Sequence, residues 1–220
     1  MMRKPFAILI SALCAALCGC GGGGDAPAQA SAAPVIEFYG DSLTFGSIEG
    51  PAGTLTRLAV PPVRRAQELL GDSALCVDLS LPGATVADAL AGVAMMPFGR
   101  FADHVRTTQA STLVIRYGGA DALRAVPLAD FERDLAAMVA LAQAAGKRVL
   151  LVGVIATATG ETDDFDLAVE RTADAHGTGF VDVRAVPVTF PDDLADPVHP
   201  AQTWSDRITA AIVQHLQTTH

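Results

Sequence analysis

Residues 35–44 read VIEFYGDSLT, and this stretch predicts how the rest of the chain is arranged. Residues 35–39 are mostly β-branched, apolar or aromatic, as in a buried strand, and a glycine, an acid and a serine follow at once. In open α/β sheets, ligands bind in the crevice at the carboxyl ends of the strands. Ser42 is therefore either a nucleophile presented to that crevice or part of an ordinary Gly-Asp-Ser turn.

The segment DPVHP at 196–200, just before the last helical pattern, favours the nucleophile. A serine hydroxyl is a weak nucleophile at neutral pH, so it needs a base such as imidazole, and the imidazole needs an acid that orients it. Asp196 and His199 can supply both groups from one loop. An Asp-x-x-His pair alone is weak evidence, but together with Gly-Asp-Ser it predicts a Ser42-His199-Asp196 triad.

Four segments in this order resemble the SGNH hydrolases, the GDSL-type lipases and esterases. They read GDSLT at 40–44, LPGAT at 81–85, YGGAD at 117–121 and DPVHP at 196–200. The resemblance covers roughly residues 34–217. It implies that the chain hydrolyses carboxylic esters through the triad, with O-acetyl groups on an envelope polysaccharide, small aryl or alkyl esters, or thioesters as candidates. A short acyl chain is expected, because no extended apolar loop in the sequence indicates a tunnel for a long one. It further implies an oxyanion hole that contains the N–H groups of Ser42 and Gly83.

The third segment departs from the family pattern. The family usually has Gly-x-Asn-Asp there, and the asparagine side chain is a third oxyanion donor, but this chain has Ala120. Loss of one such donor typically costs about 10²–10³ in turnover. Arg116 and Tyr117, at the end of the strand predicted just before this segment, are either substitutes for the missing donor or a buried strand end whose polar tips reach solvent.

Two other functions stay open on the sequence. The chain could be a catalytically weak or inactive lipoprotein that keeps the fold and binds an envelope glycan, a reading that Ala120 supports. It could also be an O-acyltransferase, which passes the same acyl group to a sugar hydroxyl instead of water. The expected partner is a small ester or an acylated glycan; the sequence indicates no protein partner.

Strand and helix patterns alternate from residue 35 onward, which predicts an α/β fold. With the resemblance, this indicates a three-layer α/β/α sandwich over residues 34–220, with a five-stranded parallel sheet and the flavodoxin-like fold of the SGNH hydrolases. The predicted strands are Val35–Tyr39, Ala74–Leu79, Thr112–Tyr117, Arg148–Val154 and Gly179–Val183. The predicted helices are Pro62–Leu70, Val86–Ala91, Leu128–Ala145, Asp164–His176 and Ala201–Gln217.

Three connections are not accounted for by this pattern: Thr44–Pro61, Met95–His104 and Pro187–Leu194. Because loops at the carboxyl ends of strands carry function in this architecture, they are candidate pocket walls. For Met95–His104, with its two methionines and two phenylalanines, a cap over the core is the alternative.

The first 33 residues predict export and a lipid anchor. Residues 1–19 have a short basic start and an apolar run too short to span a bilayer, as in a signal peptide. The end of this segment, LCGC, resembles a bacterial lipobox, which implies cleavage before Cys20 and acylation of that cysteine. Residues 21–33 are rich in glycine and alanine, so residues 20–33 read as a lipidated cysteine and a flexible tether. We therefore expect a cell-envelope protein held by the lipid alone, at the outer membrane, facing the periplasm or the cell surface.

The negative net charge of the chain argues against nucleic acid as a partner. The whole chain has a formal charge of −9, and removal of residues 1–19 leaves 13 basic and 24 acidic residues, a charge of −11. Such a chain is not expected to bind nucleic acid. His104, His176 and His220 have no acid or cysteine at ligand spacing, so we expect no metal and no cofactor.

Overall fold

The computed structural model describes residues 32–93, 95–155 and 162–218, and Ala33–His220 form one compact unit. The predicted signal peptide, the predicted lipidation site Cys20 and nearly all of the predicted tether lie outside the described residues. Within these ranges, no helix is both long and apolar enough to cross a membrane.

Five parallel strands form the central sheet, in the order β4-β1-β5-β6-β7. Their bounds are β1 (Val35–Gly40), β4 (Leu75–Asp78), β5 (Thr112–Arg116), β6 (Arg148–Val152) and β7 (Gly179–Val181). β1 pairs with β4 on one side and β5 on the other, so the connections diverge to opposite faces at its carboxyl end. Ligands bind at such a switch point in open α/β sheets.

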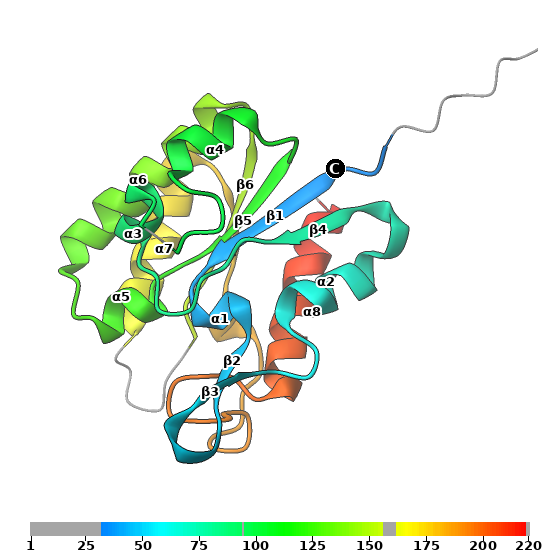
Figure 1. The fold of residues 1–220 in the computed structure, drawn as a ribbon, viewed down its shortest axis with the longest axis vertical. Coiled ribbons are helices and arrows are strands. Elements are labelled where there is room, and N and C mark those ends of the chain that lie inside the picture. Colours follow the sequence, from blue (N-terminus) through cyan, green and yellow to red (C-terminus); the bar gives the residue numbers. More distant parts are fainter. Residues whose placement is uncertain (1–31, 94, 156–161, 219–220) are drawn as a thin grey trace, which may run out of the picture. The chain divides into compact units, whose positions relative to one another are not determined.

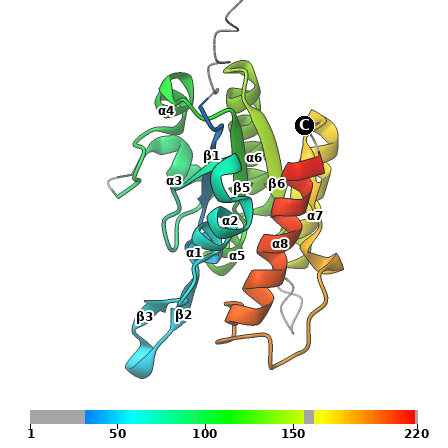
Figure 2. The same ribbon diagram turned by 90° about the vertical axis from the view of Figure 1, so that its right-hand side faces the viewer.

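Helices cover both faces of the sheet (Figures 1 and 2). One face carries α2 (Pro62–Leu70) and α8 (Gln202–Thr218); the other carries α3 (Val86–Ala91), α4 (Phe101–Thr107), α6 (Leu128–Ala144) and α7 (Asp163–His176). The predicted three-layer sandwich is confirmed, and every predicted strand and helix is present with its ends within two residues.

The structure also contains short elements that the sequence analysis did not predict. They are the helices α1 (Ser42–Phe45) and α5 (Gly119–Leu123), the hairpin strands β2 (Ser47–Glu49) and β3 (Leu55–Arg57), and the 3₁₀ turns Pro51–Gly53, Gly71–Ser73 and Val183–Ala185. α4 is a further helix inside a segment that was predicted as a connection. Helices of one or two turns are not stable by themselves, so tertiary contacts must hold them.

The segment Met95–His104 caps the core and does not line the cavity beside Ser42. The rings of Phe98 and Phe101 lie 5.1 and 5.3 Å from the ring of Tyr39, in edge-to-face contact. Phe101 and Tyr39 are both fully buried. Of the two readings of this segment, the core cap agrees with the structure.

The turn from β1 into α1 depends on Gly40. A Cβ added there would lie 2.1 Å from Thr44 Oγ1 and 2.4 Å from the carbonyl oxygen of Arg116. The second atom belongs to the neighbouring strand and cannot move aside. We expect Gly40→Ala to lower the free energy of unfolding by about 3 kcal/mol or more, as overpacking does in a rigid core.

The matched control is Gly146→Ala. Gly146 follows α6 with φ of +72° and has no atom within 4 Å of an added Cβ, so only backbone strain of about 1 kcal/mol is expected. Urea unfolding of both variants measures the difference. Equal losses in the two variants would contradict the close approach at Gly40.

Candidate active site

Ser42 opens the one-turn helix α1 at the carboxyl end of β1. Asp41 caps this helix: its Oδ1 accepts a hydrogen bond from the N–H of Leu43 at 2.9 Å. The helix ends at Gly46, whose φ of +80° is in the left-handed region that favours glycine. The tight turn leaves the Ser42 hydroxyl at the edge of the sheet where ligands bind.

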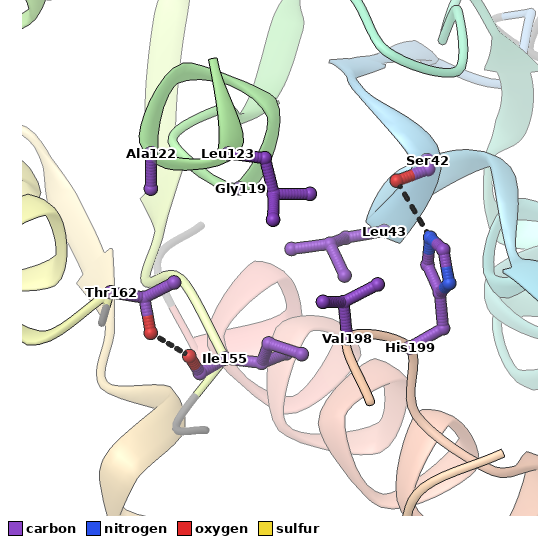
Figure 3. A pocket seen from close by; sticks show the side chains of 9 residues that line it. All are labelled: Ser42, Leu43, Gly119, Ala122, Leu123, Ile155, Thr162, Val198 and His199. Carbon is purple, nitrogen blue, oxygen red and sulfur yellow. Dashed lines mark hydrogen bonds between the residues drawn. The ribbon is translucent and has the colours of Figure 1, made fainter. Parts of the chain in front are cut away.

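The loop before α8 brings His199 and Asp196 to this hydroxyl. His199 Nε2 lies 3.0 Å from Ser42 Oγ (Figure 3), although the two residues are 157 positions apart. On its other side, His199 Nδ1 lies 2.8 Å from Asp196 Oδ2 and 3.0 Å from Oδ1. The structure thus places the three predicted residues in one continuous chain of hydrogen bonds.

The Asp196 carboxylate is held by main-chain donors. Its Oδ1 accepts the N–H groups of Val198 and His199, each at 2.9 Å, and its Oδ2 accepts the N–H of Glu49 at 2.7 Å. Burial by itself would raise the pKa of this carboxyl, but the hydrogen bonds from Val198 and Glu49 and the adjacent His199 outweigh it and lower the pKa. Asp196 is therefore ionised at neutral pH.

Asp41 ties the nucleophile turn to the third sequence segment. While its Oδ1 caps α1, its Oδ2 accepts the N–H of Ala120 at 2.9 Å. The side chain is fully buried, and burial raises its pKa despite these two hydrogen bonds and the nearby guanidinium of Arg116. One carboxylate thus fixes the start of α5 against the start of α1.

The second segment reaches the same edge by extending the β4–β1 pairing. The N–H groups of Leu79 and Leu81 donate to the carbonyls of Phe38 and Gly40, both at 2.9 Å. A turn follows in which Gly83 has φ of +76°, again a conformation that favours glycine. In the part of the chain that the structure describes, the N–H groups of Ser42 and Gly83 have no hydrogen-bond acceptor. Both are available to a ligand.

Neither Arg116 nor Tyr117 replaces the missing asparagine. The Arg116 guanidinium is buried and lies 3.4 Å from the carbonyl oxygens of Leu43 and Gly153. It does not line the cavity beside Ser42 and His199. Burial lowers its pKa to about 10, against the charges of Asp41 and Asp166, so it stays protonated at neutral pH. The Tyr117 hydroxyl is buried without a partner among the described residues. The strand-end reading of both residues agrees with the structure, except that their polar ends do not reach solvent.

A cavity of about 300 Å³ opens beside the Ser42 and His199 side chains (Figure 3). The other described residues that line it are Leu43, Gly119, Ala122, Leu123, Ile155, Thr162 and Val198. The hydroxyl of Thr162 donates to the carbonyl of Ile155 at 2.6 Å. Among the described lining residues, His199 is the only side chain that can carry a charge, and none is aromatic apart from its imidazole.

The predicted pocket walls are wrong for the described part of the cavity. Besides Ser42 and Leu43 of α1, its lining comes from α5, from Ile155 after β6, from Thr162 before α7 and from the loop of Val198 and His199. None of these segments was proposed as a wall. The Thr44–Pro61 connection forms the β2–β3 hairpin instead. The Pro187–Leu194 connection is fastened to α8, where Arg207 pairs with Asp193 at 2.6 Å.

No group of three or more His, Cys, Asp or Glu side chains within residues 32–93, 95–155 and 162–218 is arranged to hold a metal ion.

A sequence model of the GDSL-like lipase/acylhydrolase family matches residues 38–203. This match spans the nucleophile turn, both middle segments and the triad loop. No curated protein matches the chain.

Solved structures of several esterases share the fold. The aryl esterase of M. smegmatis superposes with a TM-score of 0.71 at 17% identity, over 86% of this chain and all of the other. A carbohydrate acetylesterase from Sinorhizobium meliloti gives 0.68 at 15% identity, over 85% of this chain and all of the other. An acetylxylan esterase from Geobacillus stearothermophilus gives 0.65 at 20% identity, over 83% of this chain and 94% of the other. At these identities the likeness establishes a shared fold.

Asp41→Asn should uncouple the nucleophile turn from α5. An amide has one acceptor oxygen, so its NH₂ would face the N–H of either Leu43 or Ala120. We expect the free energy of unfolding to fall by about 2 kcal/mol and turnover of any Ser42-dependent reaction to fall about tenfold or more. Chemical unfolding and steady-state kinetics measure the two effects.

Asp174→Asn, at an exposed position on α7, is the matched control and should change neither quantity. An Asp41→Asn variant as stable and as active as this control would remove Asp41 from its organising role.

The buried carboxyl group of Asp121 should make the free energy of unfolding depend on pH. Burial, together with the charge of Asp41, raises its pKa to about 7 although its Oδ1 accepts the N–H of Val86. An unfolded aspartate titrates near ~3.9, so between about pH 4 and pH 7 the folded chain binds more protons at this site, and the site's contribution to stability falls as pH rises.

Asp121→Asn should abolish this loss. We expect the variant to gain about 1–3 kcal/mol over the wild type when urea unfolding at pH 7.5 is compared with unfolding at pH 4.5. A stability difference that is constant over this range would show that Asp121 is ionised in the folded chain throughout.

Proposed function

The chain belongs to the GDSL-like lipase/acylhydrolase family, and from this premise we propose that it hydrolyses carboxylic esters with Ser42, His199 and Asp196. The observation that carries the proposal is the hydrogen-bonded chain from Ser42 Oγ through both ring nitrogens of His199 to an ionised Asp196. These three roles are those of nucleophile, general base and orienting acid.

In the acylation half, His199 Nε2 takes the proton of the Ser42 hydroxyl while Ser42 Oγ attacks the ester carbonyl carbon. Asp196 holds the Nδ1–H of the imidazole and stabilises the imidazolium that forms. His199 then gives the proton to the departing alkoxide, and an acyl group remains on Ser42. In the second half a water molecule takes the place of the alcohol, and the same steps release the acid.

The developing oxyanion would be held by the N–H groups of Ser42 and Gly83, which have no acceptor among the described residues. Ala120 presents a methyl group where the family pattern has an amide donor, and neither Arg116 nor Tyr117 lines the described pocket. A two-donor oxyanion hole of this kind predicts turnover about 10²–10³ below that of a three-donor enzyme.

The cavity indicates the acyl side of the substrate. Its volume of about 300 Å³ is roughly twice that of an engineered apolar cavity that holds benzene, so it exceeds the needs of an acetyl group. Its described walls are mainly aliphatic, and among the described lining residues a carboxylate or phosphate would find no cation except protonated His199. We therefore propose neutral esters of short acyl groups, from acetyl to chains of several carbons, as substrates.

The binding-protein reading has one observation in its favour, the missing donor at Ala120. Against it, a pocket freed from catalysis has no need of the Ser42-His199-Asp196 chain, which is complete in this structure. The alcohol part of the substrate can be a glycan, as for the acetylesterases that share the fold. Nothing in the described pocket favours a sugar hydroxyl over water as acyl acceptor.

For the first 33 residues we keep the reading from the sequence. We propose that the segment before Cys20 is removed, that Cys20 carries the lipid, and that the hydrolase acts at the cell envelope on its tether.

Hydrolysis of a p-nitrophenyl ester series from two to twelve carbons tests this function. We expect turnover that depends on Ser42, with a loss of at least about 10³-fold in Ser42→Ala. Ala122→Leu adds bulk to the cavity wall, so we expect kcat/KM for esters of four or more carbons to fall about tenfold or more while acetate esters are less affected.

Ala137→Leu, at an exposed position on α6, is the control for the added bulk and should leave the series unchanged. Full turnover in Ser42→Ala would refute the proposed nucleophile. An Ala122→Leu profile identical to that of the control would show that the acyl group binds elsewhere.

A further inference from the structure

The β2–β3 hairpin contacts both the nucleophile helix and the acid of the triad. From β2, the N–H of Glu49 donates to Asp196 Oδ2 at 2.7 Å. From β3, Arg57 Nε donates to the carbonyl of Phe45, the last residue of α1, also at 2.7 Å. Just after β3, the N–H of Leu58 donates to the carbonyl of Gly46 at 2.9 Å.

The β3 side of the hairpin supports a helix that cannot support itself. α1 has a single turn, and the carbonyls at its end need hydrogen-bond donors from outside the helix. Arg57 supplies one of them, stacks on the Phe45 ring at 3.9 Å from its centroid, and forms an ion pair with Asp78 at 2.5 Å. Because Asp78 ends β4, Arg57 holds α1 to the central sheet.

The β2 side supplies the contact that the triad loop cannot make for itself. The two main-chain N–H groups on Asp196 Oδ1 come from the same short loop, from Val198 and His199. Oδ2, which also contacts His199 Nδ1 at 2.8 Å, is bound in addition by the N–H of Glu49. Among the described contacts, this N–H is the one main-chain donor to Asp196 that reaches it from a distant part of the chain.

We propose that the β2–β3 hairpin is a strut that fixes the spacing between the nucleophile helix and Asp196, and that the N–H of Glu49 is a positioning group of the triad. The inference rests on the proposed function. Because one β-hairpin holds the helix with one strand and the carboxylate with the other, a shift of the acid relative to Ser42 breaks a contact at one end. The Glu49 side chain is exposed and has no part in this role.

Substitution at position 49 separates the N–H from the side chain. Glu49→Ala keeps the donor and is the matched control; Glu49→Pro removes it. The neighbouring hairpin bond from the N–H of Gly50 to the carbonyl of Thr54 does not use this donor and remains possible in both variants. We expect Glu49→Ala to keep wild-type kinetics and Glu49→Pro to lower kcat about tenfold or more on a p-nitrophenyl ester with KM nearly unchanged.

A second readout does not require turnover. The proton between His199 Nδ1 and Asp196 should give a low-field proton resonance, assigned by its loss in His199→Ala. We expect this resonance in the wild type and in Glu49→Ala, and we expect it to move upfield or broaden in Glu49→Pro. Should the proline variant not fold, replacement of the residue-49 amide by an ester removes the same N–H without a ring and takes its place in both measurements.

The outcomes separate the two claims. If the wild type turns over the ester, and the variant that lacks the N–H keeps the same kcat and the same resonance, the proposed positioning role of the hairpin is wrong. An equal loss in Glu49→Ala would assign the effect to the side chain and overturn it as well. No Ser42-dependent turnover in the wild type would refute the proposed function, while a resonance that changes only when the N–H is removed would still support the positioning role.

Discussion

The buried carboxylate of Asp41 is the interaction on which the site depends. Its two oxygens accept N–H groups from two strand ends, that of Leu43 after β1 and that of Ala120 after β5. Main-chain donors and a cation beside it offset part of the cost of a charge so far from water. Without this acceptor, the first turns of α1 and α5 would each lose a partner, and the start of α5 would no longer be tied to the turn that carries Ser42.

The parallel sheet does the rest of the assembly. Every strand delivers its carboxyl end to the same edge, so residues as distant in sequence as Ser42 and His199 meet there. Buried acids then join the connections: Asp121 accepts the N–H of Val86 at the start of α3, and Asp196 accepts that of Glu49 in the hairpin. The site is held chiefly by carboxylates that accept main-chain N–H groups, and the long helices supply the core beneath it.

The sequence predicted the features that have a strong local signal. The five strands and the five longer helices carry their apolar patterns over many residues. Ser42, His199 and Asp196, which the structure brings within hydrogen-bond distance, could be singled out because their side chains have recognisable chemistry. α1, α5 and the β2–β3 hairpin were missed because contacts such as Arg57 to Phe45, and not local propensity, hold them. Pocket residues such as Ala122 and Ile155 have no chemical signature, and the N–H of Glu49 is one that any residue except proline would provide. The role of Arg116 could not be predicted, because its position at a strand end does not reveal on which face of the sheet its side chain lies.

The central claim is that Ser42 is an activated nucleophile, and covalent labelling tests it most directly. The domain of residues 34–220 would be treated with a fluorophosphonate, and the adduct would be located by mass spectrometry of its peptides. The account predicts one phosphonyl group per chain, on Ser42, with none in Ser42→Ala and a much slower reaction in His199→Ala. A folded wild-type protein that takes no label, or takes it on another residue, would contradict the account.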